Sequence, residues 1–541
     1  MEAFLHPLQG LAEFEEIKKR CGANCGILNV SGCMESQKVH LMYGLSGLFP
    51  YHLILADDER NAKEIYEDYR FYDKNVYFYP AKDLLFFQAD IHGNLLIRQR
   101  MRVIRALLEQ EEVTVVTSID GCMDFLMPLE KIRSRLLHFK SDSVIDLDQL
   151  KEELVELGYE RTGQVELPGQ FSVRGGIIDI YPLTEDNPWR IELWDDEVDS
   201  IRSFDAESQR SLENVDEITI YPAVEKMDGE DMVSFLDYFP EEKTLVFLDE
   251  LNHLAENGEG VEEEYRQSRM HREEKGEANL PEQWLCGFQE LQKKLNRRNC
   301  VAVSALSPRR SGWKINEEFD LTVKSVDSYN SSFELLVKDL LQYKSQGYRI
   351  ALLSGSRTRA ERLAKDLSEE GLNAFYSQDM DRIISPGEIM VVYGHARRGF
   401  QYPLIKFAVM TETDIFGKEQ KKRKKKKKYS GNRIQDFAEL SIGDLVVHEK
   451  HGLGIYRGIE KVEVDRVVKD YIKIEYRGGS NLYILATQLD ALQKYSGSSE
   501  NAKTPKLNKL GGQEWNKTKS RVKGAVKNIA KELVELYAVR Q

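Results

Sequence analysis

Residues 446–458 read VVHEKHGLGIYRG, which places three glycines among apolar and aromatic residues. Glycines at this density let the backbone take positive φ angles and turn tightly between short strands. A run of eight basic residues, 421–428, precedes this stretch, and a segment rich in strand-forming residues follows it. The pattern predicts a small all-β module that ends a longer α/β chain.

The composition of the 541 residues fits several soluble domains, with 41% hydrophobic and 31% charged residues. No apolar run reaches the length that a membrane helix requires, and the first residues lack the features of a signal peptide. We therefore expect a cytoplasmic protein without membrane contact. The net charge of −14 argues against a surface that binds nucleic acid throughout, although a local basic site stays open.

The six cysteines match no zinc framework, because Cys21 and Cys25 stand without a second pair. Free thiols are expected. His448 and His451 are three residues apart, with no third ligand at metal spacing, so we interpret them as turn residues and predict no metal site.

Alternating strand and helix patterns in residues 1–125 predict a parallel sheet covered on both faces. Closely spaced strands around 169–182 and 189–194 predict an antiparallel sheet inserted into this α/β domain. The expected segments are an ATPase-like first part (1–125), the inserted α+β domain (126–212), the second part (213–330), a further α/β domain (331–417), a basic linker (418–436), the β module (437–496), a second linker (497–510) and a helix (511–541).

The last helix carries one apolar stripe, formed by Val522, Val526, Ile529, Leu533 and Leu536. No capping residue ends it, which leads us to expect further sequence downstream. The basic run 421–428 is interpreted as a solvated linker, because no aromatic residues interleave it to stack on bases.

A degenerate phosphate loop follows the first strand. Gly32 and Lys38 fit the pattern G-x-x-x-x-G-K-[ST], whereas Gln37 stands for its second glycine and Val39 for its hydroxyl residue. The loop thus lacks both backbone room for phosphate and a magnesium ligand. Asp249 and Glu250 follow an apolar strand, as magnesium-binding carboxylates of an ATPase do. We expect a relic of a nucleotide site that hydrolyses no ATP.

Arginines and aromatic residues on the inserted sheet are candidates for a protein interface. An ordinary solvated sheet face with core aromatics is the alternative. The candidates are Arg161, Phe171, Arg174, Asp179 and Tyr181.

Residues 154–161, 174–176, 181–182 and 194–205 resemble the domain through which UvrB and the transcription-repair coupling factors bind UvrA. The resemblance extends over nearly the whole chain and follows the domain order of the coupling factors. It implies a UvrB-like region in residues 1–330 and makes the five residues of the inserted sheet candidate UvrA contacts. Residues 411–417 are similar to the end of the family's third domain.

Residues 440–495 resemble the polymerase-binding domain of the same family, a Tudor-like barrel shared with CarD-type regulators. There a sheet edge pairs with a strand of the RNA polymerase β subunit, which main-chain hydrogen bonds can hold. The resemblance places this edge at Lys461, Val462, Glu463 and Val464, with Lys469 and Tyr471 beside it.

Residues 511–515 and 529–538 look like the helix that leads into the family's DNA translocase. The translocase itself is not in these 541 residues, so ATP, Mg²⁺ and double-stranded DNA are expected only with that motor. The resemblance implies a monomeric adaptor between RNA polymerase β and UvrA. A UvrB-like helicase or a CarD-like transcription regulator is the alternative.

Overall fold

The computed structural model describes residues 1–21, 25–82, 94–224, 232–274, 285–308, 312–416, 440–448, 451–464, 467–485, 492–495 and 507–509. The first of two compact units holds the described residues up to 416 except 94–98, and the second holds 94–98 and those from 440 onward. The basic run 421–428 and the expected C-terminal helix lie outside the described residues. In the described part, no helix has the length and apolar character needed to cross a bilayer.

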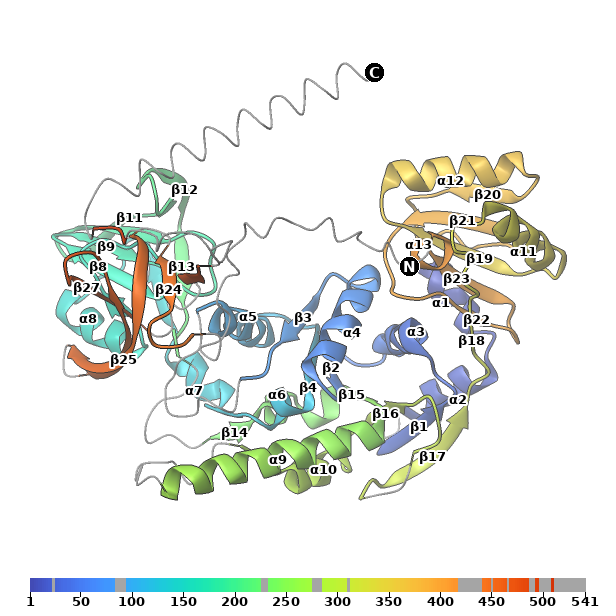
Figure 1. The fold of residues 1–541 in the computed structure, drawn as a ribbon, viewed down its shortest axis with the longest axis horizontal. Helices are drawn as coiled ribbons and strands as arrows, with labels where there is room; N and C mark the ends of the chain where they lie inside the picture. Colours follow the sequence, from blue (N-terminus) through green and yellow to red (C-terminus); the bar gives the residue numbers. More distant parts are fainter. Residues whose placement is uncertain are drawn as a thin grey trace, which may run out of the picture. The chain divides into compact units, whose positions relative to one another are not determined.

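A seven-stranded parallel sheet organises the first unit, as the sequence predicts (Figure 1). Its apolar strands are buried on both faces, because helices cover them. In sheet order the strands are β17 (Ile315–Asp320), β1 (Ile27–Ser31), β16 (Cys300–Val303), β15 (Thr244–Asp249), β2 (Tyr51–Ala56), β4 (Val113–Ser118) and β3 (Val76–Tyr79). The helices of this region are α1 (Glu2–Leu8), α2 (Ala12–Cys21), α3 (Glu35–Ser46), α4 (Glu59–Tyr72), α5 (Asn94–Glu109), α6 (Ile119–Met123), α9 (Leu251–Glu274) and α10 (Phe288–Leu295).

The second sheet is inserted between β4 and β15, and it has six strands. The strands expected around 169–182 and 189–194 are antiparallel, as predicted, whereas the short edge strand β7 runs parallel to β8. The order is β12 (Ser211–Val215), β11 (Glu197–Phe204), β10 (Trp189–Trp194), β9 (Ile177–Ile180), β8 (Gln170–Arg174) and β7 (Glu160–Arg161). Short elements complete the insertion: β5 (Phe125–Leu126) with β14 (Val233–Ser234), β6 (Leu137–Lys140) with β13 (Glu217–Ile220), α7 (Leu129–Ser134), α8 (Leu147–Glu156), and the 3₁₀ turns η2 (Phe235–Tyr238) and η3 (Glu241–Lys243).

The third sheet belongs to the α/β region expected after residue 330. Its order is β18 (Lys324–Ser325), β22 (Phe400–Tyr402), β23 (Phe407–Thr411), β19 (Arg349–Ser354), β21 (Glu388–Tyr393) and β20 (Asn373–Tyr376). One face, with Ile350 and Leu352, packs under α11 (Phe333–Ser345) and α12 (Arg357–Glu369). The other face, with Ala351 and Leu353, shares a hydrophobic core with α1, α3 and α4 of the first sheet. A short helix, α13 (Glu412–Phe416), follows β23.

The second unit contains the β module that residues 446–458 predict. Its five antiparallel strands are, in order, β27 (Asn481–Leu485), β26 (Val467–Glu475), β25 (Gly452–Val464), β24 (Leu445–His448) and β28 (Leu492–Lys494). The glycines have distinct tasks: Gly452 and Gly458 take φ angles of +80° and +105°, and a Cβ on Gly454 would lie 2.5 Å from Ile474 Cγ2. Gly458 also coincides with a register shift in the β25–β26 pair, where a positive φ angle lets the strand bulge.

Candidate functional site

The altered phosphate loop lies between β1 and α3, and its backbone donors are already occupied. Gly32 and Cys33 donate their N–H groups to the carbonyls of Ala305 and Ser304, at 3.3 and 3.1 Å. Gly32 has a φ angle of +78°, and a Cβ there would lie 2.1 Å from the carbonyl oxygen of Leu321. A phosphate loop needs such N–H groups for its ligand. Here the N–H groups of Gly32 and Cys33 are bonded instead to the segment that follows β16.

The side chain of Gln37 fills the space that a glycine would leave open. It is fully buried, its Oε1 accepts the N–H of Met34 at 3.0 Å, and its Nε2 donates to the Tyr402 hydroxyl at 3.0 Å. Val39 is also fully buried and brings no hydroxyl group. The loop is therefore tied to the third sheet through Tyr402.

Lys38 has carboxylate partners from its own chain. Its Nζ lies 2.7 Å from Asp249 Oδ1 and 2.6 Å from Glu250 Oε1. Burial opposes the charge on Lys38, but the two carboxylates outweigh burial and raise the pKa of its ammonium group. Asn61 binds the other oxygen of Asp249 at 2.7 Å. The residues predicted as a nucleotide relic thus come together, with the lysine and the acidic pair satisfying one another.

A second polar cluster joins α3 and α4 to the third sheet. Asp68 accepts from the Ser36 hydroxyl at 2.7 Å and from Nε of Arg397 at 3.1 Å. The backbone N–H of Arg398 donates to Ser36 Oγ at 3.1 Å. The fully buried His40 lies between the Tyr402 hydroxyl and the carbonyl of Phe4, at 3.1 and 2.9 Å, and burial lowers the pKa of its imidazole to about 4.

The inserted sheet carries an arginine–aspartate cluster on one face. Asp179 is buried and accepts from Nη2 of Arg174 at 2.8 Å. Arg190 binds the same carboxylate with two donors, at 2.6 and 2.9 Å, and its guanidinium lies 4.3 Å from the centroid of the Phe204 ring. Register places Asp179 opposite both Ser172 and Arg190. Arg174, with 46% of its side chain exposed, is the member of the cluster that a partner can reach most easily.

The other candidates on this sheet differ in exposure. Arg161 is exposed, and Tyr181 is partly buried and donates its hydroxyl to the carbonyl of Asp186 at 2.7 Å. Phe171 is fully buried, because its side chain is on the core face of the sheet with Ile180. A direct contact of Phe171 or Asp179 with a partner, as the sequence suggested, does not fit their burial. Phe171 packs in the core under the sheet, and Asp179 holds the arginines of the surface through its carboxylate.

In the β module, part of β25 offers a free edge. β24 pairs with β25 only at Gly452–Ile455, whereas β26 pairs with it as far as Val464. In the described residues, the stretch 459–464 therefore has a strand on one side only. This stretch contains Lys461, Val462, Glu463 and Val464, and Lys469 lies opposite Val462 on β26. Tyr471 is buried, so its contribution to a surface is small. The rings of His448 and His451 lie 4.8 Å apart between centroids and are tilted by 39° to one another, at the β24–β25 turn.

Two known domain families match these two β-rich regions. The UvrB interaction domain matches residues 137–225, and the CarD-like/TRCF RID domain matches residues 440–496. A transcription-repair-coupling factor of Bacillus subtilis is 31% identical over 95% of this chain and 49% of its own length. The chain is a relative of the transcription-repair-coupling factors. Those of Staphylococcus epidermidis and Staphylococcus aureus MRSA252 are 30% and 29% identical over 90% and 86% of this chain, and 46% and 44% of their own lengths. The chain spans about half the length of these curated relatives.

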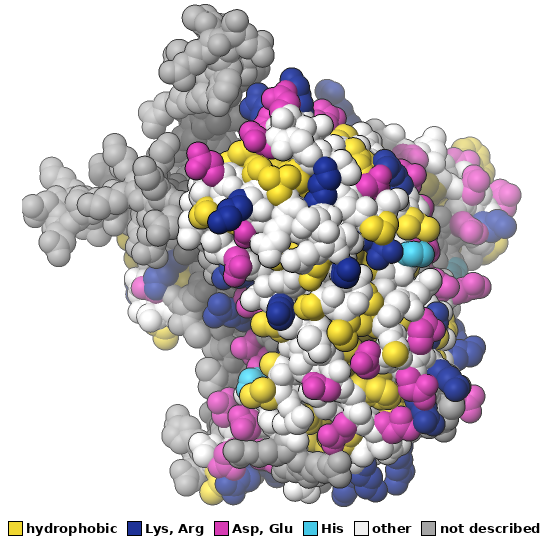
Figure 2. Space-filling model, turned by 90° about the vertical axis from the view of Figure 1, so that its right-hand side faces the viewer, with side chains coloured by type: hydrophobic (Ala, Val, Ile, Leu, Met, Phe, Trp, Pro, Cys, Tyr) yellow, Lys and Arg dark blue, Asp and Glu magenta, His cyan; other side chains and the backbone are white. Residues whose placement is uncertain are grey.

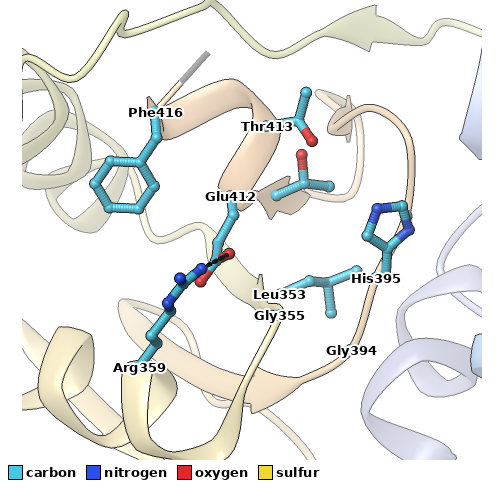
Figure 3. A pocket seen from close by; sticks show the side chains of 10 residues that line it. Leu353, Gly355, Arg359, Gly394, His395, Glu412, Thr413 and Phe416 are labelled. Carbon is cyan, nitrogen blue, oxygen red and sulfur yellow. Dashed lines mark hydrogen bonds and ion pairs between the residues drawn. The ribbon is translucent and has the colours of Figure 1, made fainter. Parts of the chain in front are cut away.

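This relative of the coupling factors also has a cavity of about 530 Å³ at the carboxyl ends of β19, β21 and β23 (Figure 3). Arg359 points to Glu412 across the cavity, at 3.4 Å, and Glu412 also accepts from the Ser354 hydroxyl. These polar groups thus satisfy one another. Figure 2, which faces the side where the third sheet lies, shows basic, acidic and hydrophobic side chains interspersed. Among the residues that the structure describes, this face has no extended basic field of the kind that nucleic acid requires.

Sequence reasoning missed Arg190, Tyr402 and Arg397. The strand 189–194 alternates apolar and polar residues, which places Arg190 on the same face as Glu192. That alternation was a usable signal for Arg190 once the neighbouring strand was known. No such signal exists in the sequence for Tyr402 and Arg397, because their partners Gln37 and Asp68 lie more than 300 residues away along the chain.

Proposed function

We propose that this chain is an adaptor for transcription-coupled DNA repair, which binds UvrA through the inserted sheet and the RNA polymerase β subunit through β25. The observation that carries the proposal is the presence of both matched domains in one chain, the UvrB interaction domain and the CarD-like/TRCF RID domain. Each of these regions has a surface that suits a protein partner. One has an arginine cluster, and the other has an edge strand.

For UvrA, the contact surface centres on Arg174 and Arg161. Asp179 and Arg190 hold Arg174 on the sheet face, so that less side-chain entropy is lost on binding. In a titration of the whole chain with UvrA, Arg174→Glu should weaken binding at least ten-fold, since it reverses the charge of an anchored arginine. Arg210→Glu, an exposed arginine of the same domain, is the matched control. Equal affinities for both variants would remove Arg174 from the site.

For RNA polymerase, the edge at 459–464 pairs with a strand of the β subunit. Main-chain hydrogen bonds supply the affinity, and alternate side chains such as Val462 supply selectivity. Val462→Asp should abolish capture of the β subunit by the whole chain, while Asn481→Asp, at an exposed position of β27, should leave it intact. Capture of β by the Val462→Asp variant would contradict edge pairing.

We further propose that the phosphate loop neither binds nor hydrolyses ATP and that this chain needs no cofactor. ATP-driven movement on double-stranded DNA would belong to the coupling-factor motor outside these residues. The ion pairs of Lys38 and the occupied donors of Gly32 and Cys33 support this view. Phosphate release by this chain that Lys38→Ala abolishes would overturn it and favour a UvrB-like ATPase. We also propose that the adaptor is cytoplasmic and monomeric. Sedimentation of the purified chain would test the monomeric state.

A further inference from the structure

An exposed tryptophan lies at the tip of the β10–β11 hairpin, apart from the arginine–aspartate cluster. Trp194 is 80% exposed and pairs across the hairpin with Glu197. Glu197 in turn pairs with Val144, which is 70% exposed. Directly opposed residues of antiparallel strands point to the same face, about 5 Å apart. Val144, Glu197 and Trp194 therefore form one row on the surface, which we name the Trp194 row.

The backbone holds this row firmly. Val198 N–H donates to the carbonyl of Ser143, at 2.9 Å, and Ile145 N–H donates to that of Asp196, at 2.8 Å. Asp195 takes a φ angle of +61° in the two-residue turn of the hairpin. The exposure of Trp194 is thus a property of ordered strands, and a partner would lose little backbone entropy on binding there.

Acidic residues surround the row. Segments 141–148 and 194–199 contain seven carboxylates and no lysine or arginine. Asp148 pairs with Lys151, and Asp146 caps α8. The remaining five have no lysine or arginine partner among the described residues, and they are Asp142, Asp195, Asp196, Glu197 and Asp199.

We propose that the Trp194 row binds a lysine- or arginine-rich segment of a partner protein. Tryptophan is enriched among the residues that dominate interface energies, and its ring is the best of the aromatic faces for a cation. The five free carboxylates attract basic side chains and repel nucleic acid. The inference goes beyond the adaptor function, since it concerns a surface and a partner chemistry of its own.

The test uses the whole chain and a fluorescein-labelled probe peptide of eight lysines around one central leucine. Trp194→Ala should weaken probe binding about ten-fold, which is the usual scale for a central interface tryptophan. Asp195→Asn with Asp196→Asn should weaken it and flatten its salt dependence, because fewer ion pairs form. Leu212→Ala, an exposed apolar residue on β12 of the same sheet, should leave binding unchanged. Unchanged urea midpoints would show that all three variants are folded.

Several results would overturn the proposal. Equal binding by wild type and Trp194→Ala would mean that the probe responds to charge alone. A Trp194-dependent dimer in sedimentation would make a second copy of this chain the occupant. A large gain in probe affinity after residues 421–428 are replaced by glycine and serine would make that run the occupant. Arg174→Glu adds negative charge near the row, because the β8–β9 turn bonds to Leu193, so it should strengthen probe binding while it weakens UvrA binding. Failure here and failure of the UvrA proposal are therefore distinguishable.

Discussion

The side-chain amide of Gln37 donates to the hydroxyl of Tyr402 across 365 residues of sequence, at 3.0 Å. Gln37 occupies the position where a phosphate loop has its second glycine, and Tyr402 belongs to the third sheet. The change that closes the loop to phosphate therefore also anchors the third sheet on α3.

Tyr402→Phe tests this anchor. It leaves Nε2 of Gln37 and Nδ1 of His40 without their buried partner, so we expect a loss of about 1–3 kcal/mol in the free energy of unfolding. Urea denaturation measures it. Tyr393→Phe, a half-exposed tyrosine of the same sheet, is the control and should change stability little. Equal stability of the two variants would mean that the hydroxyl of Tyr402 does not stabilise the fold.

Lys38→Met tests the internal ion pairs. Without the ammonium group, Asp249 and Glu250 lose their cation, and removing one partner of a buried pair costs about 3–5 kcal/mol. The double change Asp249→Asn with Glu250→Gln in the Lys38→Met background should recover part of this loss. Lys63→Met, a more exposed lysine paired with Glu59, should be nearly neutral. A stable Lys38→Met protein would indicate that the pair contributes no stability.

His40 makes stability depend on pH. Its pKa is about 4 in the fold because of burial, whereas an unfolded histidine has about 6.5, so the unfolded chain takes up the proton first as pH falls. The contribution of the neutral ring is complete above pH 6.5 and is lost as pH falls to 4. The difference between the two pKa values corresponds to about 3 kcal/mol in the free energy of unfolding. His40→Gln should flatten the pH dependence of unfolding between pH 7 and 4.5, although the buried His52, with the same shift, keeps part of it. An unchanged slope would contradict this role.

Arg190 should act on UvrA binding without contacting UvrA. Arg190→Ala removes two of the donors on buried Asp179, and we expect a loss of about 2 kcal/mol in stability. Arg174 should then be drawn toward the unpaired carboxylate, and UvrA affinity should fall several-fold. Arg190→Lys, which keeps the charge but not the two-pronged geometry, should restore stability only in part. Full UvrA affinity in Arg190→Ala would show that Arg174 needs no support.

Much of the architecture could be predicted from local patterns. The apolar runs before Ser31, Ala56 and Ser118 became parallel strands, because a run buried on both faces needs no long-range information. The glycines at 452 and 458 marked a β module for a similar reason, since positive φ angles at a turn and a bulge are local demands on the backbone, whereas the close approach at Gly454 is to Ile474 on β26.

The sequence by itself determined which chemistry the loop at Gly32 lacks, because Gln37 is not a glycine and Val39 has no hydroxyl group, whatever surrounds them. It also brought Lys38, Asp249 and Glu250 into one predicted site. Only the tertiary structure decided that Lys38 pairs with both carboxylates, that Gln37 bonds to Tyr402, and that Phe171 faces the core while Trp194 faces solvent. Such facts depend on which strands become neighbours and which face of a sheet is covered, and contacts across hundreds of residues leave no periodic trace in the chain.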